Sequence, residues 1–175
     1  MANATDLLLD ALGRVEESVG AVLDDLGDDE LVARPVAGAN TVAWLVWHLT
    51  RVMDDHLADA FDRDQVWIAD GWAKRFGLPF SDGATGYGQS ADDVGRVRVS
   101  GDLLRGYHEA TQRFAADLVR SVSEEQLDVI VDRRWDPPVT LAVRLVSLVN
   151  DATQHVGQAA YAAGILLRAR AATGA

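Results

Sequence analysis

Residues 40–61 read NTVAWLVWHLTRVMDDHLADAF, and the apolar residues in this stretch recur every three or four positions. One set of them would share a side of a helix: Val42, Leu45, Leu49, Val52, Met53 and Ala60. At 3.6 residues per turn, such spacing places side chains on one face, which packs against a core. The stretch therefore predicts an amphipathic helix over about residues 41–61, with Asn40 as its N-cap.

The same spacing of apolar residues occurs in three further segments, at about residues 3–26, 101–122 and 140–168. Helices with one apolar stripe each are typical of a four-helix bundle. We therefore expect an all-α fold in a single domain that spans residues 1–175. A short helical turn is expected within residues 123–132. Residues 95–100 alternate like a short strand, although they could also lack regular structure.

The connection between the second and third predicted helices, residues 62–100, is longer than a bundle crossover needs. It carries five large aromatic side chains, namely Trp67, Trp72, Phe76, Phe80 and Tyr87. Exposure of so many aromatic groups to water is unfavourable. We therefore expect this connection to pack over the bundle, where it could form the wall of a pocket.

Composition excludes several classes of function. The net charge is −11 and the basic residues are scattered, so a nucleic-acid partner is not expected. There is no run of about 18 apolar residues and no basic start typical of a signal peptide, so we expect a cytoplasmic protein without a membrane partner. There is no cysteine, which excludes disulfides, thiolate metal sites and a cysteine nucleophile.

A candidate metal site lies on the second and fourth predicted helices. Residues 148–167 read LVNDATQHVGQAAYAAGILL, in which Asp151 and His155 stand four apart and are neighbours on one helical face. His48 lies on the flank of the apolar stripe of the second helix. Two imidazoles and one carboxylate suit Zn²⁺, and would also accept Ni²⁺, Fe²⁺ or Mn²⁺. The alternative is a surface Asp–His hydrogen bond together with a half-buried histidine.

Other polar residues near these positions are candidates for substrate contacts. Trp44 lies one turn before His48 on the second helix, and Asp55 shares the face of His48 seven residues later. Gln158 shares the side of the fourth helix that carries Asp151 and His155. The two remaining histidines have simpler expectations. His56 is expected in the core or at the end of the bundle, and His108 could serve as a third imidazole.

The stretch at residues 40–61, followed by a late helix with an acid four residues before a histidine, resembles the DinB superfamily. More narrowly, it resembles the metal-binding domain of mycothiol-dependent maleylpyruvate isomerase and related thiol-transferase-like proteins. The resemblance implies an up-down-down-up bundle with a divalent metal near one end, held by His48, Asp151 and His155. Aspartate departs from the family pattern of histidine or glutamate. Since it is one methylene shorter than glutamate, Asp151 would reach the metal by a helix shift or through water.

The resemblance also implies a reaction. Related proteins use low-molecular-weight thiols, so we expect a metal-dependent transferase that activates such a thiol, mycothiol above all, for attack on an electrophilic small molecule. The isomerase activity is less expected, because the family's isomerase carries an additional C-terminal domain. A homodimer is possible. Two alternatives stay open: a metal-dependent hydrolase, and a non-catalytic metal-binding module of the stress response.

Overall fold

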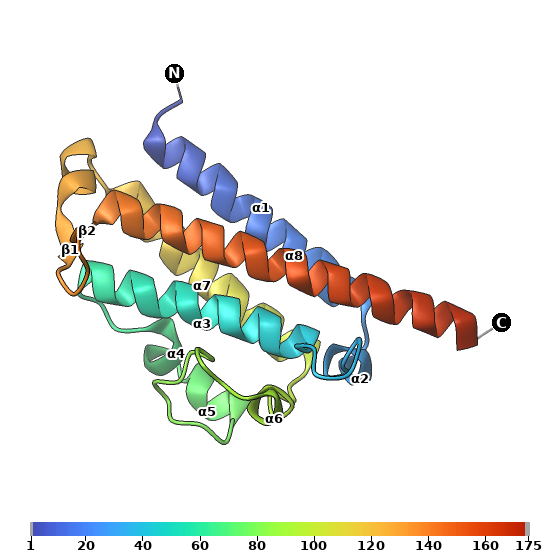
Figure 1. Cartoon of the computed structure of the whole chain (residues 1–175). Coiled ribbons are helices and arrows are strands. Elements are labelled where there is room, and N and C mark those ends of the chain that lie inside the picture. The colour runs from blue at the N-terminus through green and yellow to red at the C-terminus, as the bar shows by residue number, and fades with distance from the viewer. Residues whose placement is uncertain (1, 174–175) are drawn as a thin grey trace.

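Four long helices run side by side in the computed structural model, which describes residues 2–173 of the 175-residue chain (Figure 1). They are α1 (Ala4–Asp25), α3 (Val42–Phe61), α7 (Gly101–Ser121) and α8 (Leu141–Thr173). These bounds agree with the predicted segments to within one residue, except that α8 continues five residues beyond the predicted end. The predicted all-α four-helix bundle is confirmed.

The helices have the up-down-down-up arrangement. In Figure 1, α1 and α8 run in one direction, whereas α3 and α7 run in the other. Helix α3 packs against α7 and α8, and α1 packs against the same two helices. Helices α3 and α8 are therefore antiparallel neighbours, so residues near the middle of one face residues near the middle of the other.

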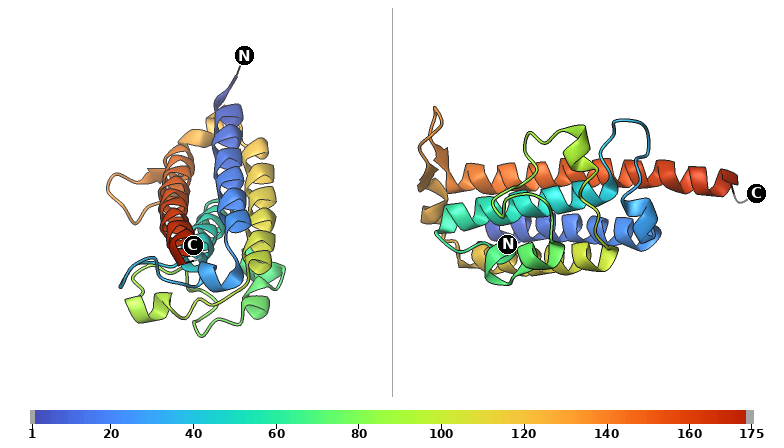
Figure 2. Two further views of the ribbon diagram at one scale, coloured as in Figure 1. Left: turned by 90° about the vertical axis from the view of Figure 1, so that its right-hand side faces the viewer. Right: turned by 90° about the horizontal axis from the view of Figure 1, so that it is seen from below.

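Helices α3 and α7 follow each other in the chain but run in the same direction, so the chain must return along the bundle between them. Residues 62–100 make this return, and we call them the crossover. They include the short helices α4 (Val66–Ala69), α5 (Trp72–Phe76) and α6 (Ala91–Val94). The view from below in Figure 2 shows this segment lying over α3. The predicted packing of the aromatic connection is confirmed for Trp67 and Phe76, which are buried in the core, but it is wrong for Tyr87, which is 93% exposed. Residues 95–100 form a turn and irregular chain.

The crossover changes the environment of α3. Residues 42–51 of this helix are all buried, although the periodicity predicted one buried and one wetted face. That prediction is wrong for this half of the helix, because the bundle covers one side and the crossover covers the other. As a result, polar side chains on the outer side of α3 are enclosed, and they need hydrogen-bond partners.

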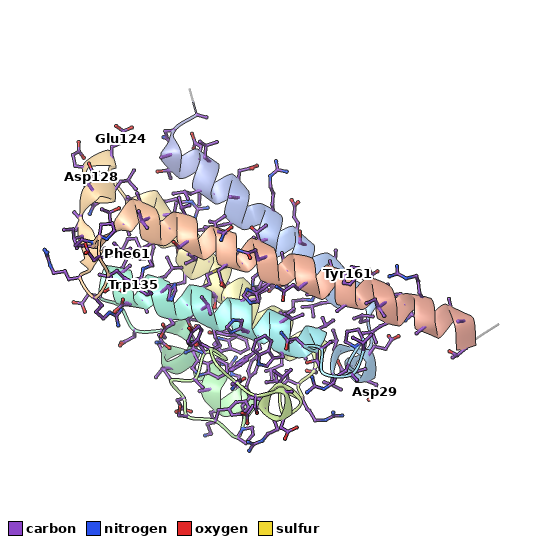
Figure 3. The ribbon with its side chains drawn as sticks, in the orientation of Figure 1. Asp29, Phe61, Glu124, Asp128, Trp135 and Tyr161 are labelled. Atoms are coloured by element: carbon purple, nitrogen blue, oxygen red, sulfur yellow. The ribbon has the colours of Figure 1, made fainter. Side chains whose placement is uncertain are left out.

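Two further connections complete the fold. Helix α2 (Asp28–Leu31) lies between α1 and α3. Between α7 and α8, the 3₁₀ helix η1 (Glu124–Asp128) is followed by a small antiparallel hairpin of β1 (Ile130–Asp132) and β2 (Val139–Thr140). The helical turn was predicted, whereas the hairpin was not. Its tip carries Trp135, which Figure 3 labels at the end of the bundle that holds the hairpin.

Side-chain caps fix where the helices begin. Asn3 and Asp6 form a reciprocal capping box at the start of α1. Helix α3 is capped by Thr41, whose hydroxyl accepts from the backbone N–H of Trp44 at 3.1 Å. The prediction of Asn40 as this cap is wrong by one residue, because threonine offers the same type of acceptor one position later. Among the described residues, no helix is both long and apolar enough to cross a membrane.

A polar cluster joins three helices inside the core. His108 on α7 is almost fully buried, and its Nδ1 lies 3.0 Å from the hydroxyl of Thr50 on α3. Its Nε2 lies 3.3 Å from the amide nitrogen of Gln112, which donates to the backbone carbonyl of Leu12 on α1. Burial lowers the pKa of His108 to about 4. His108 is therefore a neutral structural residue that faces Thr50 and Gln112.

The buried imidazole predicts an acid-sensitive fold. The unfolded chain binds a proton at His108 below about pH 6.5, whereas the folded protein binds it only near pH 4. The unfolded state thus binds more protons, and the contribution of His108 makes stability fall as the pH drops from about 6.5 to 4. The loss is at most about 3 kcal/mol. Urea denaturation of the wild type and of His108→Gln across this range should show a shallower pH slope in the variant.

NMR of the wild type gives a second readout that does not depend on the variant's folding. The His108 ring signals should not titrate above about pH 5. A pKa near 6.5 for this ring would contradict the interpretation.

Candidate functional site

The side chains of the three predicted metal ligands lie close together between α3 and α8. The ring centroids of His48 and His155 are 4.6 Å apart, with the rings inclined by 75°. Nδ1 of His155 lies 3.4 Å from Oδ2 of Asp151, one turn earlier on α8. Residues more than 100 positions apart in sequence are brought together because the two helices are antiparallel neighbours.

His48 is held in one orientation. Its Nδ1 lies 2.5 Å from the backbone carbonyl oxygen of Thr85 in the crossover, and its ring stacks on Trp44 at 4.6 Å and 15°. Since a carbonyl can only accept, Nδ1 carries the proton and donates. Burial lowers the pKa of His48, so the ring is neutral at pH 7. Nε2 is left as the atom with a free lone pair, the usual arrangement of a metal-binding histidine.

The crossover lies unusually close to this ring. Gly86 has a φ of +99°, and a Cβ atom added there would lie 2.7 Å from Nδ1 of His48 and within about 3.2 Å of two tryptophan rings. Gln89 of the same loop also contacts α3, because its side-chain oxygen accepts from Nε1 of Trp44 at 2.7 Å. Glycine is required at residue 86 by both backbone conformation and space.

A buried arginine fixes the loop that carries Thr85. The guanidinium of Arg51 is fully buried and donates through Nε to the backbone carbonyl of Ala84 at 3.2 Å. Its two terminal nitrogens donate to Gln65 at 2.8 Å and to the hydroxyl of Tyr107 at 3.1 Å. Arg51 therefore connects α3, α7 and two parts of the crossover.

Asp54 balances the charge of Arg51 one turn along α3. Its carboxylate lies 3.4 Å from the guanidinium and accepts from the hydroxyl of Tyr107 at 2.8 Å. It also accepts from the backbone N–H groups of Val66 and Trp67, at 2.9 and 2.7 Å, at the start of α4. We call Arg51, Asp54 and Tyr107 the buried hub. It pins the beginning of the crossover by Asp54 and a later part by Arg51.

Asp151 and His155 form a coupled pair on α8. Nδ1 of His155 donates to the backbone carbonyl of Asp151 at 2.9 Å. The neighbouring carboxylate of Asp151 raises the pKa of His155. Burial opposes ionisation of Asp151, but the neighbouring His155 prevails and the pKa of Asp151 is lowered. Oδ2 of Asp151 is buried without a hydrogen-bond partner among the described residues, which is unusual for a carboxylate oxygen.

The donor set fits a divalent cation in its chemistry. It offers two imidazoles, each with Nδ1 bonded to a backbone carbonyl, and one carboxylate oxygen without a partner. Among the described residues, no three His, Asp or Glu side chains are already spaced to hold a metal ion.

The predicted substrate contacts lie in different surroundings. Trp44 packs on His48 and is largely buried, so it supports the imidazole. Asp55 lies two turns from His48 on α3 and accepts from the side chain of Gln65 at 2.8 Å. Gln158 is exposed and lines a cavity of about 210 Å³ together with Tyr161. The structure does not bring these three residues to one point.

A larger cavity, of about 580 Å³, lies where the β1–β2 hairpin meets α3 and α8. It is lined by His56, Asp132, Arg134, Trp135, Val139, Arg144 and Ser147. Sequence reasoning assigned none of these a ligand-binding role. Only Arg144 carried a signal, because it shares the side of α8 that holds Asp151 and His155. Burial lowers the pKa of His56, which lies at the bundle end as expected.

The architecture and the paired histidines define a DinB-like four-helix bundle. A crystal structure of a conserved protein from Enterococcus faecalis superposes with a TM-score of 0.89 at 29% identity, covering 95% of this chain and 98% of that one. The family model for mycothiol-S-transferase matches residues 7–166, and the chain belongs to this family. Among curated proteins, none matches the sequence significantly.

The close approach of Gly86 to His48 can be tested with a matched pair of substitutions. Gly86→Ala adds a Cβ in a strained backbone and in occupied space, so we expect a loss of about 2–4 kcal/mol in the free energy of unfolding. Gly88→Ala is the control, because Gly88 also has a positive φ (+72°) but nothing within 4 Å of an added Cβ. Its loss should be about 1 kcal/mol, from the backbone alone.

Chemical denaturation measures both changes, and NMR of the His48 ring gives a local readout. Equal losses in the two variants, or an unshifted His48 signal in Gly86→Ala, would show that the loop does not press on the imidazole.

Proposed function

We propose that this protein is a divalent-metal-dependent transferase that joins a low-molecular-weight thiol, mycothiol in the first instance, to an electrophilic small molecule. One observation carries the proposal: in a member of the mycothiol-S-transferase family, His48 and His155 are in ring contact beside a carboxylate oxygen without a partner. The chain has no cysteine, so the reacting sulfur must come from a second molecule.

His48, His155 and Asp151 would hold the cation. Their two nitrogens and one oxygen suit Zn²⁺, and Ni²⁺, Fe²⁺ or Mn²⁺ accept the same donors. Once bound, the cation would supply positive charge that lowers the pKa of a nearby thiol. The carbonyl of Thr85 and the ring of Trp44 keep His48 in the orientation that this role needs.

The reaction forms a carbon–sulfur bond. The thiol loses its proton to solvent, and the sulfur electron pair attacks an electrophilic carbon of the second substrate. In a substitution, the bond from this carbon to its leaving group breaks and the leaving group departs with the electron pair. We propose that the exposed amide of Gln158, one turn from His155 on α8, contacts the bound substrate. A cytoplasmic location and a homodimer stay predictions.

The metal site predicts a defined ion content. Untagged protein should contain about one divalent ion per chain by elemental analysis, and the double variant His48→Ala/His155→Ala should contain none. Asp117→Asn, which removes an exposed carboxylate on α7, is the control and should keep the ion. Native protein that is free of metal and cannot be reloaded would overturn the metal site.

Turnover should depend on an added thiol. Wild-type protein should accelerate the reaction of mycothiol with chloroacetanilide, whereas the double histidine variant should not. Product formation without any thiol would instead identify hydrolysis by a metal-bound water. Binding of metal without any reaction of thiols would favour a non-catalytic module.

Asp151 offers a graded test of the third ligand. Asp151→Asn keeps the shape but weakens the donor, so we expect the affinity for Zn²⁺ to fall by about tenfold or more. Asp151→Glu should retain binding, because the longer acid keeps the charge and extends the reach. Competition with a zinc-sensitive dye measures both affinities. Unchanged affinity in Asp151→Asn would show that this residue is not a ligand.

A further inference from the structure

The cavity beside the hairpin is lined by two guanidinium groups and one carboxylate. One carboxylate, that of Asp132, is shared by two guanidinium groups: Arg144 donates to it at 2.8 Å, and Arg134 donates to it at 2.9 and 2.8 Å. Asp132 and Arg144 are both buried. Within the cavity lining, two guanidinium groups therefore share a single carboxylate.

Arg144 has donors to spare. A guanidinium carries five N–H donors in one plane, and the described residues take one of them, in the bond to Asp132. Arg134 is engaged more fully, because it also lies 3.6 Å from Asp59. His56 adds a further polar atom, since its Nδ1 is buried without a hydrogen-bond partner among the described residues. A planar carboxylate matches such a set, with Arg144 as its main partner.

Apart from Ser147, the rest of the lining is apolar. Trp135 lines this cavity although 67% of its surface is exposed, and Val139 lies beside it in the lining. An exposed tryptophan at the rim of a cavity offers a flat surface to a planar ligand, and its coverage removes apolar area from water. Figure 3 shows Trp135 at the end of the bundle where the hairpin meets α3.

The neighbouring cavity has the opposite character. It shares His56, Arg134 and Arg144 with the first, but its other lining residues include Asp55, Asp59 and Asp62 against a single further arginine, Arg63. These carboxylates would repel an anion. An acidic ligand should therefore occupy the tryptophan side of Arg144.

The cavity and the candidate metal site share helix α8. Ser147 lines the cavity, and Asp151 and His155 follow it on α8 by one and two turns. At 1.5 Å per residue, these positions lie about 6 and 12 Å further along the helix. A ligand anchored on Arg144 must therefore be elongated for its far end to reach the two ligand candidates.

We propose that this cavity binds the electrophilic substrate, and that the substrate is an elongated planar acid whose carboxylate binds Arg144 and whose apolar body lies on Trp135. This inference rests on the proposed function for the reaction itself, but the binding site can be tested without the reaction. The distant electrophilic carbon would then lie toward Asp151 and His155.

The binding test uses an unreactive pair of probes, 4-acetamidobenzoate and the neutral acetanilide, in calorimetric titrations. The wild type should bind the acid at least about tenfold more tightly, because a carboxylate on a guanidinium forms charge-assisted bonds. Arg144→Met should lose this preference, and Trp135→Ala should weaken both probes. Arg120→Met, which removes an exposed arginine on α7, should behave as wild type. Equal binding of acid and neutral probe by the wild type would overturn the proposal.

Removal of Arg144 leaves Asp132 with one partner fewer, so a second variant guards against a loss of folding. Ser147→Glu places a carboxylate at the exposed rim of the cavity and should abolish the preference for the acid without affecting the fold. If Ser147→Glu keeps the preference, the acid binds elsewhere and the proposal fails.

The reactive pair separates this proposal from the proposed function. With mycothiol present, 4-(chloroacetamido)benzoate should react at a lower KM than chloroacetanilide, and Arg144→Met should raise the KM of the acid alone. If neither compound reacts but the unreactive acid binds through Arg144, the transferase fails and the binding site stands. If both react equally and the acid shows no binding preference, the transferase stands and this site fails.

Discussion

The ion pair of Arg51 and Asp54 is the constraint on which the rest of the structure depends. Two successive helices that run in the same direction need a long return segment, and such a segment has no continuous set of backbone hydrogen bonds that would hold it in place. Here, two charges on one face of α3 bind its beginning, its later part and Tyr107 of α7. Loss of either charge would leave the other buried and unpaired, which typically costs about 3–5 kcal/mol. The pair thus specifies one path for the crossover.

The same ion pair is connected to the candidate site through two adjacent backbone carbonyls of the crossover. Arg51 binds the carbonyl of Ala84, and the next carbonyl, that of Thr85, binds His48. The site therefore has three sources: α3 and α8 supply the imidazoles and the carboxylate, the crossover fixes the proton of His48 on Nδ1, and the β1–β2 hairpin with α8 supplies the neighbouring cavity. Rigid helices carry the candidate ligands, while connecting segments shape what surrounds them.

The periodicity of apolar residues predicted the four helices because packing repeats with the helical turn. The spacing of Asp151 and His155, with the family resemblance of residues 40–61, was enough to place both beside His48. Contacts between distant segments left no comparable signal. Arg51 reads as an ordinary charged residue of a helix, because its burial depends on a crossover that begins only at residue 62. The role of Asp132 depends on its contact with Arg144. The two residues are separated in sequence by a hairpin that the pattern of residues did not predict.

The oxygen that holds His48 belongs to the main chain. Every amino acid carries that oxygen, so residue 85 can be substituted in evolution while the hydrogen bond to the imidazole is kept. Residue 86 cannot be substituted in this way, because only a residue without a side chain lets the loop lie so close to His48. Two relatives with this same hydrogen bond can therefore differ at most positions of the loop and share little more than one glycine. Their similarity at this point would be found in the backbone structure and not in the sequence.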